Sequence, residues 1–83
     1  MNAKEAWKLV EAKLPEYSPE CAIEFDNSFA FSLKKKSDPH GVMTGLMLYF
    51  VNKKTREITV GTLADYITTN KPKNMKTLDP DNL

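Results

Sequence analysis

The chain has 83 residues, and its 12 Lys and Arg against 11 Asp and Glu leave it almost neutral. This length allows one domain with little interior space for a cofactor, and near-neutrality argues against a nucleic-acid-binding domain, which is normally clearly basic. Cys21 is the only cysteine, so an internal disulfide is excluded, and no apolar stretch reaches signal-peptide or membrane-spanning length. We therefore expect a cytoplasmic protein that contacts no membrane.

The first predicted element is a helix close to the N-terminus. Asn2 can cap this helix, and Glu5 follows at the capping-box spacing. Pro15 disfavours helical backbone in the residue before it, which ends the helix near Lys13 or Leu14. One face of this helix is apolar and consists of Ala3, Ala6, Trp7, Val10 and Leu14.

A β-hairpin is predicted next. Residues 15–20 include two prolines and are expected to form a stiff connector. Residues 21–36, CAIEFDNSFAFSLKKK, then alternate apolar and polar side chains on both sides of an Asp-Asn-Ser break, as hairpin strands do.

Two registers are open to this hairpin. A two-residue loop at 27–28 would set Asp26 opposite Phe29. A three-residue loop at 26–28 instead pairs Phe25 with Phe29 and places the apolar side chains of both arms on one face. We favour this second register, and we expect the rings at positions 25, 29 and 31 to pack beneath the indole of Trp7.

Two more strands are predicted after a long loop. Residues 34–45 show no periodic pattern and are expected to be a loop, either functional or flexible. The apolar run 46–51 predicts a buried strand, residues 52–56 predict a polar turn, and residues 57–60 predict a returning strand that Gly61 ends.

The chain then predicts a short second helix, which Thr62 and Asp65 would cap and which carries Leu63, Tyr66 and Ile67. The expected fold class is therefore α+β, with an N-terminal helix packed on an antiparallel sheet of about four strands and a short C-terminal helix. We expect a single domain over residues 1–70, followed by a polar, flexible tail over residues 71–83.

The residue types that carry enzymatic chemistry form no recognisable motif. His40 is the only histidine, and Cys21 lies nineteen positions away from it on the expected packed face of a strand. Glu24 and Asp26 lie two apart on the other strand face, with no second acid pair near them in a cleft. We expect no catalytic, cofactor-binding or metal site, and hence not an enzyme.

Single-strand nucleic-acid binding is a minor alternative. Residues 28–36 alternate aromatic and small side chains before three lysines, which is similar to the base-stacking strand of RNA-recognition domains. The glycine of that strand is missing, however, a helix precedes the first strand, and the phenylalanines are needed for the small core. The candidate basic patch would consist of Lys34, Lys35, Lys36, Lys53, Lys54 and Arg56.

Protein binding has a candidate surface on the sheet face opposite the first helix. The hairpin side chains expected there are small or acidic, whereas the third strand contributes apolar ones. These candidate contact residues are Met47, Tyr49 and Val51. They either meet a partner or a second copy of the chain, or they lie beneath the second helix or the tail.

One stretch resembles known bacterial domains. Residues 51–58, VNKKTREI, are similar to the last hairpin of PepSY domains and of a polymorphic-toxin immunity-protein family, which reads Val-Asp-x-x-Thr-Gly-Glu followed by Ile or Val. Arg56 stands where that motif has glycine. It therefore either adopts a left-handed backbone conformation at some cost, or the loop differs.

A broader resemblance covers most of the chain. It is to short proteins of Gram-positive bacteria and their prophages, through CAIEFD at 21–26, FAF at 29–31 and VNKKT at 51–55. The likeness implies a fold and a mobile-element setting. We expect a small non-enzymatic protein-binding module of phage or mobile-element type, with a toxin-immunity inhibitor as the alternative and a homodimer as a further alternative to a foreign partner.

Overall fold

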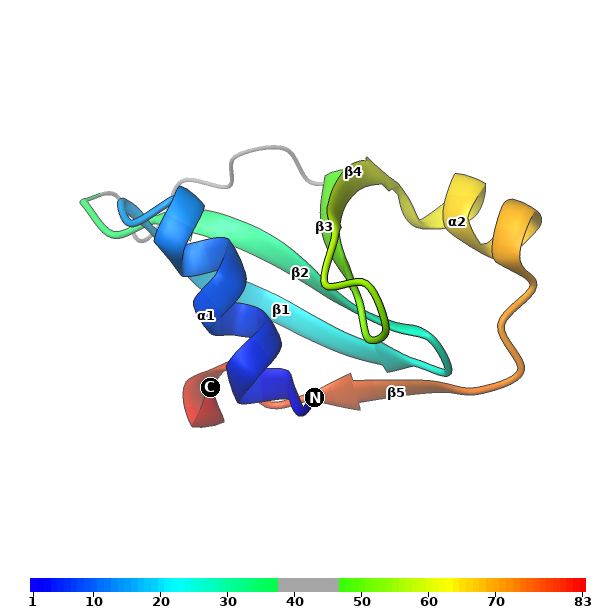
Figure 1. Ribbon diagram of the computed structural model, residues 1–83. Coiled ribbons are helices and arrows are strands. Elements are labelled where there is room, and N and C mark those ends of the chain that lie inside the picture. The colour runs from blue at the N-terminus through cyan, green and yellow to red at the C-terminus, as the bar shows by residue number, and fades with distance from the viewer. Residues whose placement is uncertain (38–46) are drawn as a thin grey trace.

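The computed structural model describes residues 1–37 and 47–83. Within these ranges it shows an α+β fold with an N-terminal helix, an antiparallel sheet of five strands and a second helix near the C-terminus (Figure 1). The predicted fold class is confirmed, with one strand more than expected. In chain order the elements are α1 (Ala3–Lys13), β1 (Tyr17–Phe25), β2 (Ser28–Lys35), β3 (Met47–Asn52), β4 (Ile58–Thr62), α2 (Leu63–Asn70), β5 (Met75–Leu78) and the 3-10 turn η1 (Pro80–Asn82).

The strands lie side by side in the order β4-β3-β2-β1-β5, and each neighbouring pair is antiparallel. Helix α1 lies across one face of the sheet, and α2 follows directly after β4, far from α1 (Figure 1). Strand β4 continues through Gly61, where the sequence predicted a break. The loop predicted over 34–45 falls largely outside the described residues, and its first two positions belong to β2.

Both helices begin where the sequence predicts. The Asn2 side chain accepts a hydrogen bond from the backbone N–H of Glu5 at 2.9 Å, and the Thr62 hydroxyl accepts one from the N–H of Asp65 at 3.1 Å. Helix α1 ends at Lys13, as the following proline requires. In each helix, therefore, the oxygen of a short side chain accepts a hydrogen bond from the first turn and stabilises it.

The hairpin register differs from the predicted one. Ile23 lies opposite Ala30 and Glu24 opposite Phe29, so the loop holds only residues 26 and 27. The three-residue loop is wrong because it assumed that only one face of the sheet is buried. The observed register puts Phe29 beneath α1 and sends Phe25 to the opposite face.

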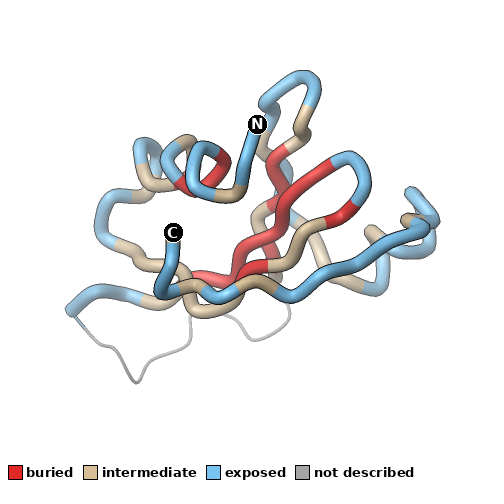
Figure 2. Tube along the Cα trace, turned by 90° about the horizontal axis from the view of Figure 1, so that it is seen from below, coloured by how far each residue is buried: buried red, intermediate tan, exposed pale blue. Residues whose placement is uncertain are grey.

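Two apolar clusters result, one on each side of the sheet, and buried residues follow the central strands and the inner side of α1 (Figure 2). The rings of Trp7 and Phe31 pack edge to face, with their centroids 5.5 Å apart, in the cluster under α1. The cluster under α2 holds Phe25, Ala30, Leu48 and Phe50, with Ile23, Leu63 and Tyr66 packed against it. Aromatic side chains are thus divided between the two faces.

The predicted connector over 15–20 is mostly strand. β1 begins at Tyr17 and includes Pro19, where the pairing with β2 shifts by one residue before Cys21. Such a bulge leaves one residue unpaired, and β5 covers β1 only from Ala22 onward. Proline is tolerated at this place because strand edges and bulges do not require its missing N–H.

The predicted flexible tail contains the fifth strand. Residues 75–78 pair with the end of β1, and Leu78 and Leu83 pack against the cluster under α1. Three of the four residues of β5 are exposed, so the strand has no buried apolar pattern that the sequence could reveal. Backbone pairing with β1 holds it in place, and composition alone does not reveal that pairing.

Candidate functional site

Strand β4 forms one end of the sheet, and among the described residues no strand pairs with its outer side. The N–H of Asn52 donates to the carbonyl of Glu57 at 2.9 Å, which fixes the alternation of the β3–β4 ladder. The backbone groups of Thr59 and Gly61 therefore point toward β3. Those of Ile58 and Val60 point away from the sheet and form an edge that is open over residues 1–37 and 47–83.

The turn before β4 holds this register firmly. The Asn52 side-chain oxygen accepts from the N–H groups of Lys54 and Thr55 at 2.8 and 2.9 Å, and the N–H of Arg56 donates to the Asn52 carbonyl at 2.8 Å. Arg56 has φ of 63°. This confirms the first of the two alternatives stated for this position, that the arginine adopts a left-handed backbone conformation where the motif has glycine. These bonds set which side of each β4 residue faces outward.

An apolar groove lies beside the open edge on the α1 side of the sheet. We call it the α1–β4 groove. It has a volume of about 260 Å³, and Val60, which is 52% exposed, forms part of its floor. The residues that line it are Val10, Lys13, Leu14, Tyr49, Ile58 and Val60, so Lys13 is the only charged residue among them.

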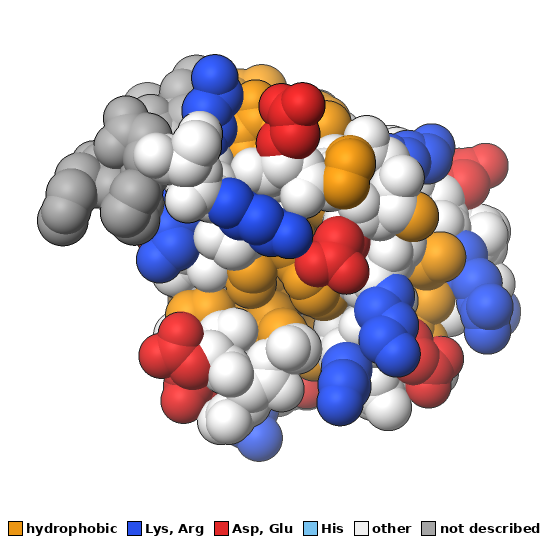
Figure 3. All heavy atoms as spheres, turned by 90° about the vertical axis from the view of Figure 1, so that its left-hand side faces the viewer, with side chains coloured by type: hydrophobic (Ala, Val, Ile, Leu, Met, Phe, Trp, Pro, Cys, Tyr) orange, Lys and Arg blue, Asp and Glu red, His pale blue; other side chains and the backbone are white. Residues whose placement is uncertain are grey.

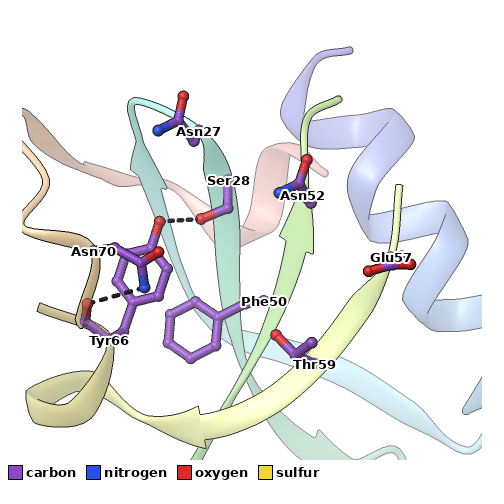
Figure 4. Close-up of a pocket in the computed structure, with 8 residues that line it drawn as sticks. All are labelled: Asn27, Ser28, Phe50, Asn52, Glu57, Thr59, Tyr66 and Asn70. Carbon is purple, nitrogen blue, oxygen red and sulfur yellow. Dashed lines mark hydrogen bonds between the residues drawn. The ribbon is translucent and has the colours of Figure 1, made fainter. Parts of the chain in front are cut away.

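A polar hollow lies on the other side of β4, beneath α2, with a volume of about 150 Å³ (Figure 4). Tyr66 closes one end, where its ring stacks on Phe50 at 4.4 Å and its hydroxyl is 2.5 Å from that of Ser28. We call it the α2-side hollow. Its lining residues are Asn27, Ser28, Phe50, Asn52, Glu57, Thr59, Tyr66 and Asn70.

The opposite end of the sheet, β5, has a different character. The hollow beside it, of about 380 Å³, is lined mainly by charged residues: Glu24, Asp26, Lys53 and Lys76, together with Phe25 and Asn74. Charged side chains, lysine above all, protect strand edges from pairing with other chains. β4 carries no charged residue between Ile58 and Thr62, so it is the unprotected edge of the two.

The predicted contact residues lie on the face that α1 covers, and not on the opposite face. Val51 is completely buried in the cluster under α1, so it contacts no partner in this fold. Tyr49 and Met47 are half-buried, and Tyr49 lines the α1–β4 groove. The prediction missed Ile58 and Val60 because it did not place their strand at the end of the sheet.

The candidate basic patch is divided between the two ends of β2. Its first three lysines lie at or just past the C-terminal end of that strand, whereas the N–H of Lys53 donates to the carbonyl of Asn27, just before the strand begins. Two members are paired with acids, since Lys36 lies 3.8 Å from Glu11 and Lys53 lies 2.9 Å from Glu24. The structure therefore does not bring Lys34, Lys35 and Lys36 together with Lys53, Lys54 and Arg56. On the face shown in Figure 3, basic and acidic side chains are interspersed.

The acids considered for catalysis have structural partners. Glu24 pairs with Lys53, and Asp26 accepts from the Asn74 side chain at 2.9 Å and from the Lys73 N–H at 2.8 Å. The Asn74 bond first, and then the Lys73 bond, hold the pKa of Asp26 below its ordinary value. Cys21 is half-buried in β1. His40 lies outside the described residues.

Over residues 1–37 and 47–83, no group of three or more His, Cys, Asp or Glu side chains is placed to hold a metal ion. Neither described helix has the length and apolar content needed to cross a membrane. Comparisons with protein-family models, with curated proteins and with solved structures find no match.

Proposed function

We propose that the chain is a small non-enzymatic protein-binding module whose open edge, β4, pairs with an extended segment of another protein. The observation that carries this proposal is Val60, whose N–H and C=O point away from β3 while its side chain stands half-exposed beside an apolar groove. In strand addition of this kind, main-chain hydrogen bonds supply affinity, and pockets for alternate side chains supply specificity.

Two features would favour single-strand nucleic-acid binding, exposed aromatic rings and a continuous basic patch, and the described residues provide neither. Phe29 and Phe31 are 2% and 0% exposed, so neither ring is available to stack on bases. The candidate basic residues lie at two ends of one strand, and two of them are paired with carboxylates. The resemblance of residues 21–26, 29–31 and 51–55 to short proteins of Gram-positive bacteria and their prophages supports a phage or mobile-element setting, and the lone cysteine supports the cytoplasm.

The proposal is tested by removing one hydrogen-bond donor. Val60→Pro deletes an N–H that faces outward, and proline is accepted on an edge strand when its nitrogen faces solvent. Val60→Thr keeps the N–H and a β-branched side chain, so it is the matched control. Circular dichroism and Trp7 fluorescence should show that both variants are folded.

The three forms of the chain are then compared as bait in an extract of the native host. We expect one protein to be retained by the wild type and by Val60→Thr, and to be lost with Val60→Pro. Equal retention by all three folded forms would contradict binding at β4. The identity of the retained protein separates a toxin-immunity inhibitor, which would hold a toxic enzyme, from a module of phage or host machinery.

A further inference from the structure

Strand β4 separates two hollows of opposite chemistry. Val60 and Ile58 turn their side chains toward the α1–β4 groove, whereas Thr59 turns its side chain toward the α2-side hollow. A strand added to this edge continues the pleat of the sheet, so its successive side chains point alternately to the two sides. One set of side chains would meet an apolar surface, and the other set a polar one.

The α1–β4 groove can accept a large apolar side chain. Its sheet side consists of Tyr49, Ile58 and Val60, and the opposite wall includes Val10 of α1 and Leu14, which caps the end of that helix. Covering Val60, which is 52% exposed, removes apolar surface from water and favours association. An aliphatic or aromatic residue of the partner is therefore the expected occupant of this groove.

The charge of Lys13 indicates a second property of the partner segment, on the side that faces the α1–β4 groove. Lys13 lines the groove, and no described acidic side chain forms an ion pair with it. A carboxylate on the partner, next in line to the apolar residue on that side, would place opposite charges at the rim of the groove. On the other side of β4, the asparagines, Thr59 and Tyr66 offer hydrogen bonds to hydroxyl or amide groups.

We infer that the segment recognised by β4 is an extended peptide in which apolar and polar residues alternate, with an acidic residue in the apolar series that reaches Lys13. This inference rests on the proposed function, because it names the chemistry of the partner at the same edge. It distinguishes the partner from a uniformly apolar strand and from a basic one.

The test uses synthetic peptides, acetylated and amidated, and the isotopically labelled full chain. The probes are Thr-Leu-Thr-Leu-Thr-Glu-Thr and its reversal, Thr-Glu-Thr-Leu-Thr-Leu-Thr, because a strand can add in either direction. One control has the same composition in an order without alternation, and another has Lys in place of Glu. Amide shifts are followed by NMR, and the comparison is repeated with Lys13→Glu.

We expect an alternating acidic peptide to shift the amides of Ile58, Val60 and Thr62, and the Lys-containing peptide to bind about tenfold more weakly. Lys13→Glu should reverse that preference. Equal binding of alternating and scrambled peptides, shifts elsewhere in the chain, no binding, or an unchanged charge preference in Lys13→Glu would each overturn the inference. Concentration-dependent shifts of β4 without peptide would identify a second copy as the occupant, and would also overturn it.

Failure of this inference is separable from failure of the proposed function. If the native partner is lost with Val60→Pro while no peptide binds as expected, the β4 edge is used for a segment of other chemistry. If Val60→Pro retains the partner as well as the wild type does, the proposed function itself is wrong, irrespective of the result of the peptide titrations.

Discussion

Arg56 is held in the left-handed backbone region, with φ of 63°, by a turn whose hydrogen bonds start from Asn52. In this region the Cβ of a residue lies too close to a backbone carbonyl oxygen, and glycine, which has no Cβ, avoids this clash. Arg56→Gly should therefore raise the free energy of unfolding by about 0.5–1 kcal/mol, measured by urea denaturation. Arg56→Ala keeps the Cβ and should give no such gain. An equal gain in both variants would attribute the effect to the lost charge.

Asp26 is a second residue with a local, measurable role. Its bonds to Asn74 and Lys73 hold its pKa below the ordinary value of 3.8, so the ionised carboxylate favours the folded chain. This contribution is present above pH 3.8 and is lost as the pH falls through the lowered pKa. The Lys73 amide proton should titrate with a midpoint below 3.8. Asp26→Asn should abolish this titration, and a wild-type midpoint above the ordinary value would contradict it.

Residue-scale features were the most predictable from the sequence, because their causes lie within a few positions. The capping roles of Asn2 and Thr62 each involve a partner three residues away, and the left-handed alternative for Arg56 came from a glycine in a local motif. The contact between Asp26 and Asn74 spans 48 positions. No local pattern indicates such a pair.

Helix α2 is attached to the sheet mainly through Tyr66. No α2 residue is fully buried, but the Tyr66 ring lies 4.4 Å from Phe50 and 4.6 Å from Phe25. Tyr66→Ala should therefore lower the free energy of unfolding by about 3 kcal/mol, as loss of a packed aromatic does. Tyr66→Phe removes only the bond to Ser28 and should cost about 1 kcal/mol. Chemical denaturation measures both, and equal losses would show that packing contributes little.

At the scale of elements, existence and type were predicted better than pairing. The hydrophobic pattern indicates both helices and four of the five strands. It does not reveal that α2 buries the second face of the sheet, and this one missing fact led to the wrong hairpin loop. β5 was missed for a related reason: four residues with exposed side chains become a strand only because the end of β1 is available for pairing.

The candidate site belongs to the scale of the whole molecule. Ile58 and Val60 look unexceptional in the sequence, and their exposure follows from the position of β4 at one end of a five-stranded sheet in the described chain. Tyr49 was predicted to contact a partner, and it does line the groove, but from the face that was expected to be core. Strand order depends on long-range pairing, so the sequence could indicate apolar strands without locating the open one.

Amide hydrogen exchange of the free, monomeric chain tests the open edge directly. The N–H groups of Thr59 and Gly61 point toward β3, whereas those of Ile58, Val60 and Thr62 point outward. We expect exchange at 59 and 61 to be about tenfold or more slower than at 58, 60 and 62, relative to each residue's unprotected rate. Slow exchange at all five positions would show that the outer side of β4 is already covered, and would contradict a binding edge.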